Sequence, residues 1–412
     1  MTTERRLAPG RGRILRYTAD LRSIAFVAIY FAVTALAFAL PFGWATAVPL
    51  VALACYWSFV CGVVTHNTVH APIFYRRGLN SLFQVLLTLT YGHPVSSYVP
   101  GHNLSHHRYT QTPRDLMRTY KARFRWNLLN QLFFGWIVGP VILRSNFVYV
   151  WRMRHRRPRW FRQWCIEFAV FLAFMAGTLA LAIATDWRKF ILFVIVPHQF
   201  AAWGIMGTNY FQHDGCDATS PYNHSRNFTG KLVNFLIVNN GYHGIHHMRP
   251  TLHWSLAPAV HAKELAPYIH PALEQKNLFT WMLRAYVWPG KRLNFDGTPV
   301  VLLHVIGSPQ MLPNAFMAVP AAQPGNFDDQ VQQQFRQVLQ QLTQGRNDTP
   351  IVTYCQGPEC WMSYNAALRA KQAPLSTFVD GALRVPLGFA PGSKYEYSSM
   401  GILLASRIAE IL

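Results

Sequence analysis

Three features of the sequence predict a mainly α-helical membrane protein with four spans, a histidine-rich cytoplasmic cap and a small, incomplete α/β segment near the C-terminal end. The first is a pair of uncharged apolar hairpins. The second is a set of histidines that recur at helical spacing just beyond these hairpins. The third is a change in charge near residue 300.

The composition favours contact with lipid. Charged residues make up 13% of the chain, which is about half the usual globular share. The net charge is +21, and residues 1–300 hold 31 Lys and Arg against 10 Asp and Glu, whereas residues 301–412 hold 7 of each. The arginines cluster beside apolar stretches, so anionic lipid headgroups suit them better than nucleic acid, and we expect no nucleic-acid partner.

The first hairpin begins after a basic leader of 22 residues. Residues 23–40 carry no charge, Pro41–Trp44 forms a turn, and a second uncharged stretch runs from Ala45 to about Val64. Each stretch is long enough to cross a bilayer. No small-residue cleavage site follows the first one, which argues against a signal peptide.

The second hairpin consists of residues 168–185 and 190–210, two uncharged stretches separated by Asp186–Lys189. Before it, residues 128–143 are apolar but short and are interrupted by Gly139 and Pro140. We therefore expect an interfacial or half-inserted helix there and not a span.

The arginine distribution predicts the orientation of these spans. The N-terminal segment and residues 152–162 are the densest basic clusters, and such clusters stay in the cytoplasm. Four spans return the chain to that side. The histidines after the spans then share the cytoplasmic face, and we expect the inner membrane of a bacterium.

Eight histidines form three motifs with helical spacing, and a ninth follows the fourth span. The motifs are His66 and His70; His102, His106 and His107; and His243, His246 and His247, and the ninth residue is His213. Nine imidazoles exceed the four to six ligands of one transition metal, so two ions are expected, with iron, zinc or copper all suited to nitrogen ligands. A metal site at the membrane surface indicates chemistry on a lipid. His93, His198, His253, His261 and His270 lack this spacing, and we assign them structural roles.

This pattern resembles the membrane fatty acid desaturases, whose motifs are HxxxH, HxxxHH and HxxHH. The resemblance covers residues 1 to about 299. It implies that all nine histidines bind metal and that Asn209, in an Asn209…His213 element, reaches a metal through water. Asp214 and Asp217 are candidates for orienting the ligands.

The resemblance further implies two non-heme iron ions, O2 as co-substrate and the introduction of a double bond into a fatty acyl chain. The fatty acyl chain would be attached to a lipid, to CoA or to an acyl-carrier protein. No heme, flavin or nicotinamide motif is present. A separate electron donor is therefore implied, such as a ferredoxin or a cytochrome b5-like protein, and the basic cap suits an acidic one.

Two other classes of function remain open from the sequence. A lipid or carotenoid hydroxylase or ketolase would use the same histidine motifs. A metal-binding sensor or storage protein would bind the ions without oxidising a substrate.

Residues 300–372 predict a small α/β unit with strands at Val300–Leu303 and Thr349–Tyr354 and helices at Asp328–Gln341 and Trp361–Lys371. The segment resembles part of a rhodanese-like domain. Cys355 matches the catalytic cysteine, but His304 stands where an Asp is usual and the second half of the fold is missing. A membrane-anchored sulfurtransferase or thiol-redox protein that uses Cys355, with Cys360 close by, is the remaining alternative.

Residues 373–412 resemble a fragment of the serine β-lactamase and esterase family. Tyr397 matches the Tyr of a Tyr-x-Asn element, but Ser399 replaces the Asn. The chain has no Ser-x-x-Lys nucleophile motif, so we expect no hydrolase activity.

Overall fold

The computed structural model describes residues 14–218, 220–288, 290, 301–309, 311, 315–343, 351–355 and 361–372. The chain divides into two compact units, one made of residues 1–122 and 128–283 and the other of residues 123–127 and 284–412. The proposed hydrolase fragment at residues 373–412, with Tyr397 and Ser399, lies outside the described residues, as does Cys360.

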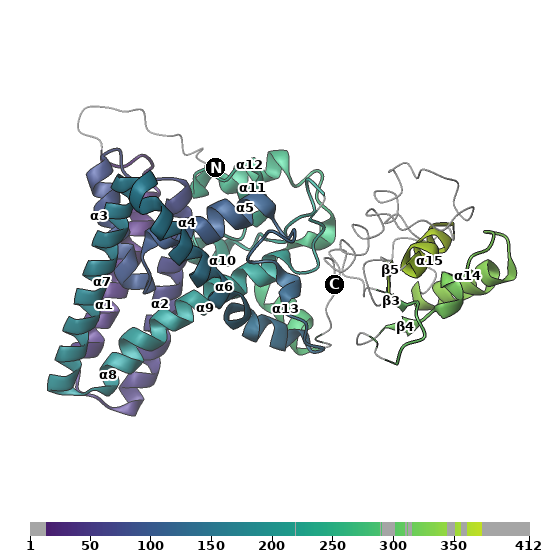
Figure 1. Cartoon of the computed structure of the whole chain (residues 1–412). Helices are drawn as coiled ribbons and strands as arrows, with labels where there is room; N and C mark the ends of the chain where they lie inside the picture. Colours follow the sequence, from purple (N-terminus) through teal and green to yellow (C-terminus); the bar gives the residue numbers. More distant parts are fainter. Residues whose placement is uncertain are drawn as a thin grey trace. The chain divides into compact units, whose positions relative to one another are not determined.

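Two helical hairpins form the long part of the first unit (Figure 1). The first consists of α1 (Asp20–Ala39) and α2 (Trp44–His70). The second consists of α7 (Pro158–Thr185) and a rod built from α8 (Arg188–Phe190), a π-helical turn (Ile191–Ile195) and α9 (Val196–His213). The four predicted spans are therefore helices.

The tips of the two hairpins meet at a buried lysine. Lys189, 4% exposed, donates from Nζ to the carbonyl oxygens of Phe38 at 2.8 Å and Leu40 at 2.7 Å. These carbonyls end α1, where a cation also offsets the negative end of the helix dipole. The histidines of α2 and α9 lie at the opposite ends of their helices.

The interruption expected at Gly139 and Pro140 within residues 128–143 was wrong. α6 runs without interruption from Asn127 to Arg156 and passes through Pro140. A proline removes one backbone hydrogen bond, and apolar helices tolerate this when neighbouring groups satisfy the freed carbonyl. Five described helices are long and apolar enough to cross a membrane: Asp20–Ala39, Trp44–His70, Asn127–Arg156, Pro158–Thr185 and Arg188–His213.

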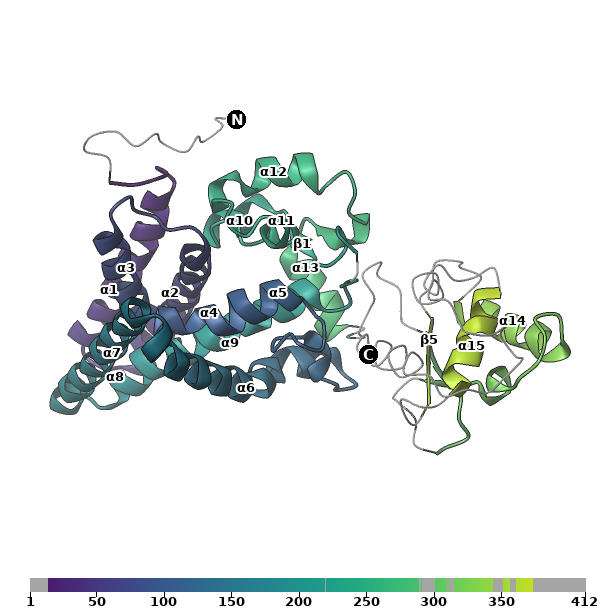
Figure 2. The same ribbon diagram turned by 45° about the horizontal axis from the view of Figure 1, so that its top comes forward.

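α6 packs against α9 through specific contacts, and Figure 2 shows the two helices side by side. Phe134 and Tyr210, both fully buried, place their ring centroids 5.1 Å apart. The indole of Trp203 donates to the carbonyl of Leu132 at 2.8 Å. α6 therefore joins the second hairpin at the end that carries His213.

Short elements form the cap over the histidine-bearing helix ends. α3 (Arg77–Tyr91) packs along the hairpins and bonds to Ser58 of α2 and His198 of α9. The cap elements before α6 are a 3-10 turn (Val95–Ser97), α4 (Tyr98–Gly101), a π-helical turn (His102–His106), α5 (His107–Tyr109) and a 3-10 turn (Thr119–Lys121). After α9 they are β1 (Asn227–Phe228), α10 (Lys231–Leu236), α11 (His243–Met248), a 3-10 turn (Trp254–Leu256), α12 (Ala257–Glu264), a 3-10 turn (Pro271–Leu273), β2 (Glu274–Gln275) and α13 (Leu278–Met282). A π-helical turn (Leu283–Val287) follows α13 in the sequence. β1 and β2 pair in parallel.

The second unit contains the predicted small α/β arrangement. Its strands β3 (Val301–His304), β4 (Phe316–Met317) and β5 (Ile351–Tyr354) form a parallel sheet in the order β4-β3-β5. A 3-10 turn (Val319–Ala322) and the helices α14 (Gln330–Thr343) and α15 (Trp361–Gln372) complete it. Leu303, Phe335 and Leu339 are buried in its core. The sequence placed α14 two residues too early, because helix ends are the least defined part of a pattern.

Candidate metal centre

All nine predicted histidines gather at one end of the hairpins. His66 and His70 occupy the last turn of α2, and His213 is the last residue of α9. α11 contributes His243, His246 and His247. The helical segment from α4 to α5 contributes His102, His106 and His107.

The nine side chains form two groups, in each of which the ligand nitrogens lie within 4.8 Å of one another. The first group is His66, His70, His102, His107 and His246, and the second group is His106, His213, His243 and His247. The groups adjoin, because the rings of His107 and His247 stack with centroids 4.4 Å apart. Each motif after the first contributes to both groups.

A π-helical turn divides the middle motif between the groups. In a regular α-helix His102 and His106, four residues apart, would share a face. The π turn at His102–His106 widens the helix. As a result His102 faces His107, five residues on, with 3.0 Å between their Nε2 atoms, and His106 turns toward the second group.

The hydrogen bonds on the outer side of the rings determine where the nitrogen lone pairs of the second group point. Nδ1 of His213 donates to the carbonyl of His224 at 2.9 Å, since a carbonyl can only accept. Nδ1 of His106 donates to the carboxylate of Asp115, also at 2.9 Å. In a neutral imidazole the second nitrogen then carries a lone pair. These two Nε2 atoms face each other at 3.1 Å.

A cation suits this arrangement of nitrogens. Nε2 of His213 also lies 2.8 Å from Nε2 of His243 and 3.1 Å from Nε2 of His247. A single proton could bridge only one of these pairs at a time. Two nitrogens that bind one ion at about 2.1 Å and at right angles lie about 3.0 Å apart. The spacing and the all-nitrogen donor set of the second group therefore fit one transition metal.

Burial keeps the imidazoles in the neutral form that a metal needs. It lowers the pKa of five histidines outside the spans well below the ordinary value, and neighbouring imidazoles lower it further; these are His102, His107, His243, His246 and His247. Their unprotonated nitrogens are consequently available as metal ligands at neutral pH.

The first group is held in the same way by two asparagines. Oδ1 of Asn67 accepts from Nδ1 of His66 at 3.2 Å, which leaves the lone pair of His66 on Nε2, free to bind a metal. Asn103 contacts Nδ1 of His70 at 3.3 Å, while Nε2 of His70 and Oδ1 of Asn103 are both buried without a partner. Turning the Asn103 amide over and placing an ion at Nε2 of His70 satisfies both atoms. The first group thus also fits a metal.

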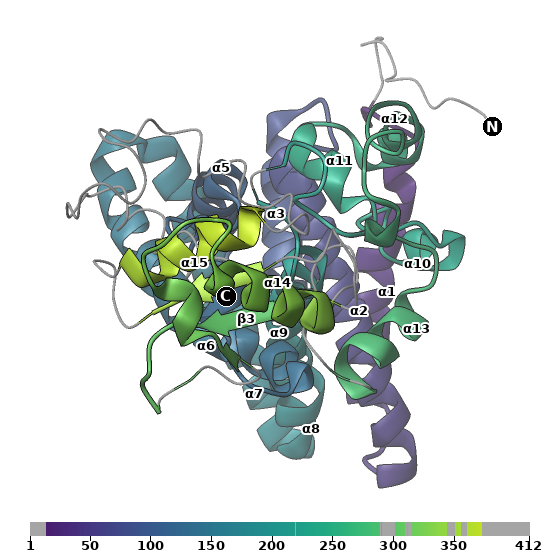
Figure 3. The same cartoon turned by 90° about the vertical axis from the view of Figure 1, so that its right-hand side faces the viewer.

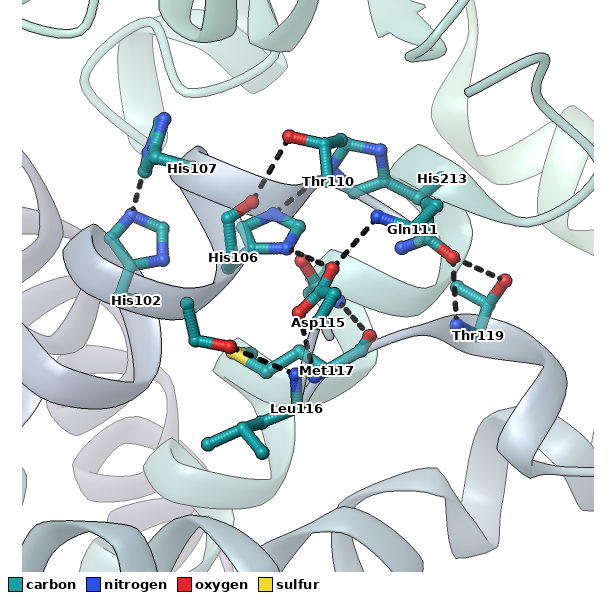
Figure 4. Close-up of polar contacts among 12 residues, drawn as sticks. His102, His106, His107, Thr110, Gln111, Asp115, Leu116, Met117, Thr119 and His213 are labelled. Carbon is teal, nitrogen blue, oxygen red and sulfur yellow. Dashed lines mark hydrogen bonds and ion pairs between the residues drawn. The ribbon is translucent and has the colours of Figure 1, made fainter. Parts of the chain in front are cut away.

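Asp115 is the carboxylate that orients the second group, and sequence reasoning missed it. Figure 4 shows its oxygens between His106 and the loop that follows α5. They accept from Nδ1 of His106, from the backbone N–H of Gln111 at 2.9 Å and from that of Met117 at 2.8 Å. An acidic residue between Arg114 and Arg118 in a basic segment was the available signal.

His224 is a second residue that the sequence did not reveal. Its carbonyl holds His213, and its ring centroid lies 5.6 Å from that of His247. Its own Nδ1 lies 2.7 Å from the hydroxyl of Ser225, and burial lowers its pKa to about 4. No motif spacing includes it, since it lies on a loop.

The family model for fatty acid desaturases matches residues 42–283, which include all nine histidines and Asp115. The chain belongs to the fatty acid desaturase family. Membership makes it a membrane protein and indicates an oxidoreductase. Among curated proteins no relative is matched to it.

An apolar cavity of about 190 Å³ lies beside the metal centre of this desaturase-family chain. Its walls include Phe59 of α2, Phe200 and Trp203 of α9, and Met282 of α13. It extends to Gln212, the residue before His213. The side-chain amide of Gln212 donates to the carbonyl of Asn240 at 2.9 Å. The cavity thus offers an apolar ligand a place next to the histidines.

Other predicted residues of the desaturase-family chain lie outside the two groups. Asn209 is buried one turn before His213 and donates to the carbonyl of Met117 at 3.0 Å, so its contact with a metal through water stays a prediction. His198, His253 and His261 bond to Leu89, Asp20 and Glu274 respectively. Nδ1 of His270 accepts from the backbone N–H of Ala272, and the rings of His93 and Tyr91 pack edge to face.

In the second unit Cys355 follows β5 at the carboxyl edge of the sheet. Its Sγ lies 3.6 Å from Oγ of Ser363 on α15. The buried ring of His304 ends the neighbouring strand and lies 5.0 Å from that of Tyr354. The family match ends at residue 283, so the rhodanese resemblance and a nucleophilic role for Cys355 remain predictions.

Proposed function

We propose that the protein is an O2-dependent diiron desaturase that introduces a double bond into a fatty acyl chain at the cytoplasmic face of a membrane. The observation that carries the proposal is the convergence of nine imidazoles in two adjoining groups whose lone pairs turn inward. Family membership supports it. Two irons, when bound, would activate O2 and supply the oxidising power for C–H cleavage.

The reaction balances only with an external reductant. One CH2–CH2 unit, one O2, two electrons and two protons give one CH=CH unit and two waters. Arg108 on α5 and Arg114 on the loop that carries Asp115 have exposed side chains close to His106 and Asp115 in the sequence. This basic surface supports docking of an acidic electron donor such as a ferredoxin or a cytochrome b5-like protein.

The chain's own contribution to catalysis is positioning. The apolar cavity binds the acyl chain without polar contacts. Burial of about ten methylenes at about 0.8 kcal/mol each contributes about 8 kcal/mol to the free energy of substrate binding. Asp115, Asn67 and the carbonyl of His224 fix the orientation of the ligand rings.

The joint centre supports a four-span topology. His70 ends α2 and His213 ends α9, and both contribute to one centre, so the chain crosses the membrane an even number of times between them. α6, α7 and the rod from α8 to α9 lie in that interval, and the last two form a hairpin. α6 therefore does not complete a crossing and lies partly in the interface, with its terminal arginines on the cytoplasmic side.

Expression of the full chain in a host with defined lipids tests the proposal. We expect new double bonds in lipid extracts with the wild type and none with His106→Ala, with equal amounts of protein in the membrane. His155→Ala, at an exposed histidine outside both groups, serves as the control and should retain activity. Hydroxylated or keto products would instead establish a hydroxylase or ketolase. Bound iron without O2 consumption in the presence of a reductant would indicate a sensor or storage protein.

A further inference from the structure

Two short cap helices expose large apolar side chains. Leu232 and Phe235 on α10 are 71% and 54% exposed, and Phe279 on α13 is 70% exposed. These helices have six and five residues, too few to cross a bilayer. Such side chains are stable when they face the acyl region of a bilayer from its surface.

The same two helices start side by side. β1 pairs with β2, and the backbone N–H of Thr229 donates to the carbonyl of Gln275 at 2.9 Å. α10 and α13 begin a few residues beyond these contacts, and Figure 3 shows them along one edge of the first unit. Lys231 and Lys276 are both exposed at this paired start. Two ammonium groups next to apolar tips match the phosphate and acyl layers of a lipid leaflet.

The inner faces of α10 and α13 line the apolar cavity. Val233 belongs to α10 and Ile237 directly follows it, and Leu278 and Met282 belong to α13. The opposite wall belongs to α9, from Phe200 to Gln212, a distance of about 18 Å along the helix axis. Phe200 is 38% exposed on a membrane-spanning helix, so the cavity is continuous with a surface that faces lipid.

We propose that the acyl chain enters this cavity sideways from the bilayer, between α10 and α13, and that the substrate is an acyl chain of an intact glycerophospholipid. The lipid phosphate stays at the surface near Lys231 and Lys276 while the chain bends inward toward His213. A thioester carried by a soluble protein or by CoA would approach from water, whereas the exposed apolar side chains of Leu232 and Phe279 suit contact with a bilayer. This inference rests on the proposed desaturase function and selects among its substrates.

A crosslinking experiment tests the route without requiring turnover. The full chain is placed in vesicles that contain a phospholipid with a photoreactive diazirine in its acyl chain. We expect label on the peptides that carry Met282 and Phe200. The double variant Leu232→Asp/Phe279→Asp should reduce the label at least ten-fold with unchanged iron content. Tyr268→Asp, at a cap residue 61% exposed, is the matched control and should label like the wild type.

A turnover comparison completes the test. The iron-loaded protein with a reductant is offered the same acyl chain as a phospholipid in vesicles or as a CoA thioester. We expect the phospholipid to be desaturated at least ten times faster, and Leu232→Asp/Phe279→Asp to remove this preference. Equal or faster desaturation of the thioester would overturn the inference, as would equal labelling of the double variant and the wild type. Labelling at the cavity with no unsaturated product from either substrate would preserve the lipid route and refute the desaturase.

Discussion

Asp115 and His106 form a fully buried pair in which the carboxylate accepts the Nδ1 proton of the imidazole across 2.9 Å. Burial alone would raise the pKa of Asp115, but His106 and the backbone N–H groups of Gln111 and Met117 lower it to about 2. The carboxylate is therefore charged at neutral pH and fixes the orientation of the His106 ring.

The substitution Asp115→Asn should weaken metal binding in the second group by about 10- to 100-fold, because the orienting charge is lost. Titration of the purified protein with iron in the presence of a competing chelator measures this affinity. Asp186→Asn, at the remote hairpin tip where Asp186 pairs with Arg188, should leave the affinity unchanged. Equal affinities for Asp115→Asn and the wild type would show that Asp115 only supports the loop.

The two histidine groups should lose metal separately. The wild type is expected to bind two ions per chain, and His213→Ala/His243→Ala should bind one, because two nitrogens of the second group remain. His66→Ala/His102→Ala/His107→Ala, which also leaves two nitrogens in the first group, should likewise retain only the ion of the second group. Metal content per chain after gel filtration reports the result. Loss of both ions in either variant would mean that the groups form one indivisible site.

Asn67 connects the first group to a strained turn. Its side chain accepts from His66 and donates to the carbonyl of Val238 at 3.2 Å. Val238 and Asn239 have φ values of 44° and 57°, which a branched residue such as Val rarely adopts. Asn67→Leu removes both hydrogen bonds and leaves the carbonyl of Val238 without this donor, which should lower the free energy of unfolding by about 1–3 kcal/mol.

Asn67→Leu is therefore expected to lower metal affinity in the first group while the second group keeps its ion. Asn67→Asp, which still accepts from His66, should recover part of that affinity. Metal content and thermal unfolding measured on the same samples separate a positioning role from general destabilisation. A lower unfolding temperature with full metal content would contradict the positioning role.

Lys189 should stabilise the packing of the two hairpins. Replacement by Met removes two charge-assisted hydrogen bonds to the end of α1, and we expect a loss of about 2–4 kcal/mol in the free energy of unfolding. Unfolding in mixed micelles measures it. Arg188→Gln, whose side chain is 42% exposed, should have a smaller effect. A larger effect for Arg188→Gln would show that the surface pair joins the hairpins.

Local sequence patterns were sufficient to identify the nine candidate ligands and most of the apolar helices that carry them. His243, His246 and His247 are close in the chain, so their spacing alone placed them together, and the lack of charge in residues 23–40 marked α1. The small α/β unit also followed from local pattern, because the strand at Val301–His304 and the helix at Gln330–Thr343 depend on nearby residues.

The division of the ligands between two groups, and the residues that orient them, depend on how distant segments pack. The assignment of His102 to one group and His106 to the other depends on a π turn that the spacing of HxxxHH does not reveal. Asp115, the carbonyl of His224 and the turn at Val238 act on residues far away in the chain, and α6 continues through Pro140. Local spacing records which side chains share a helix face, whereas contacts between distant segments arise only when the whole chain packs.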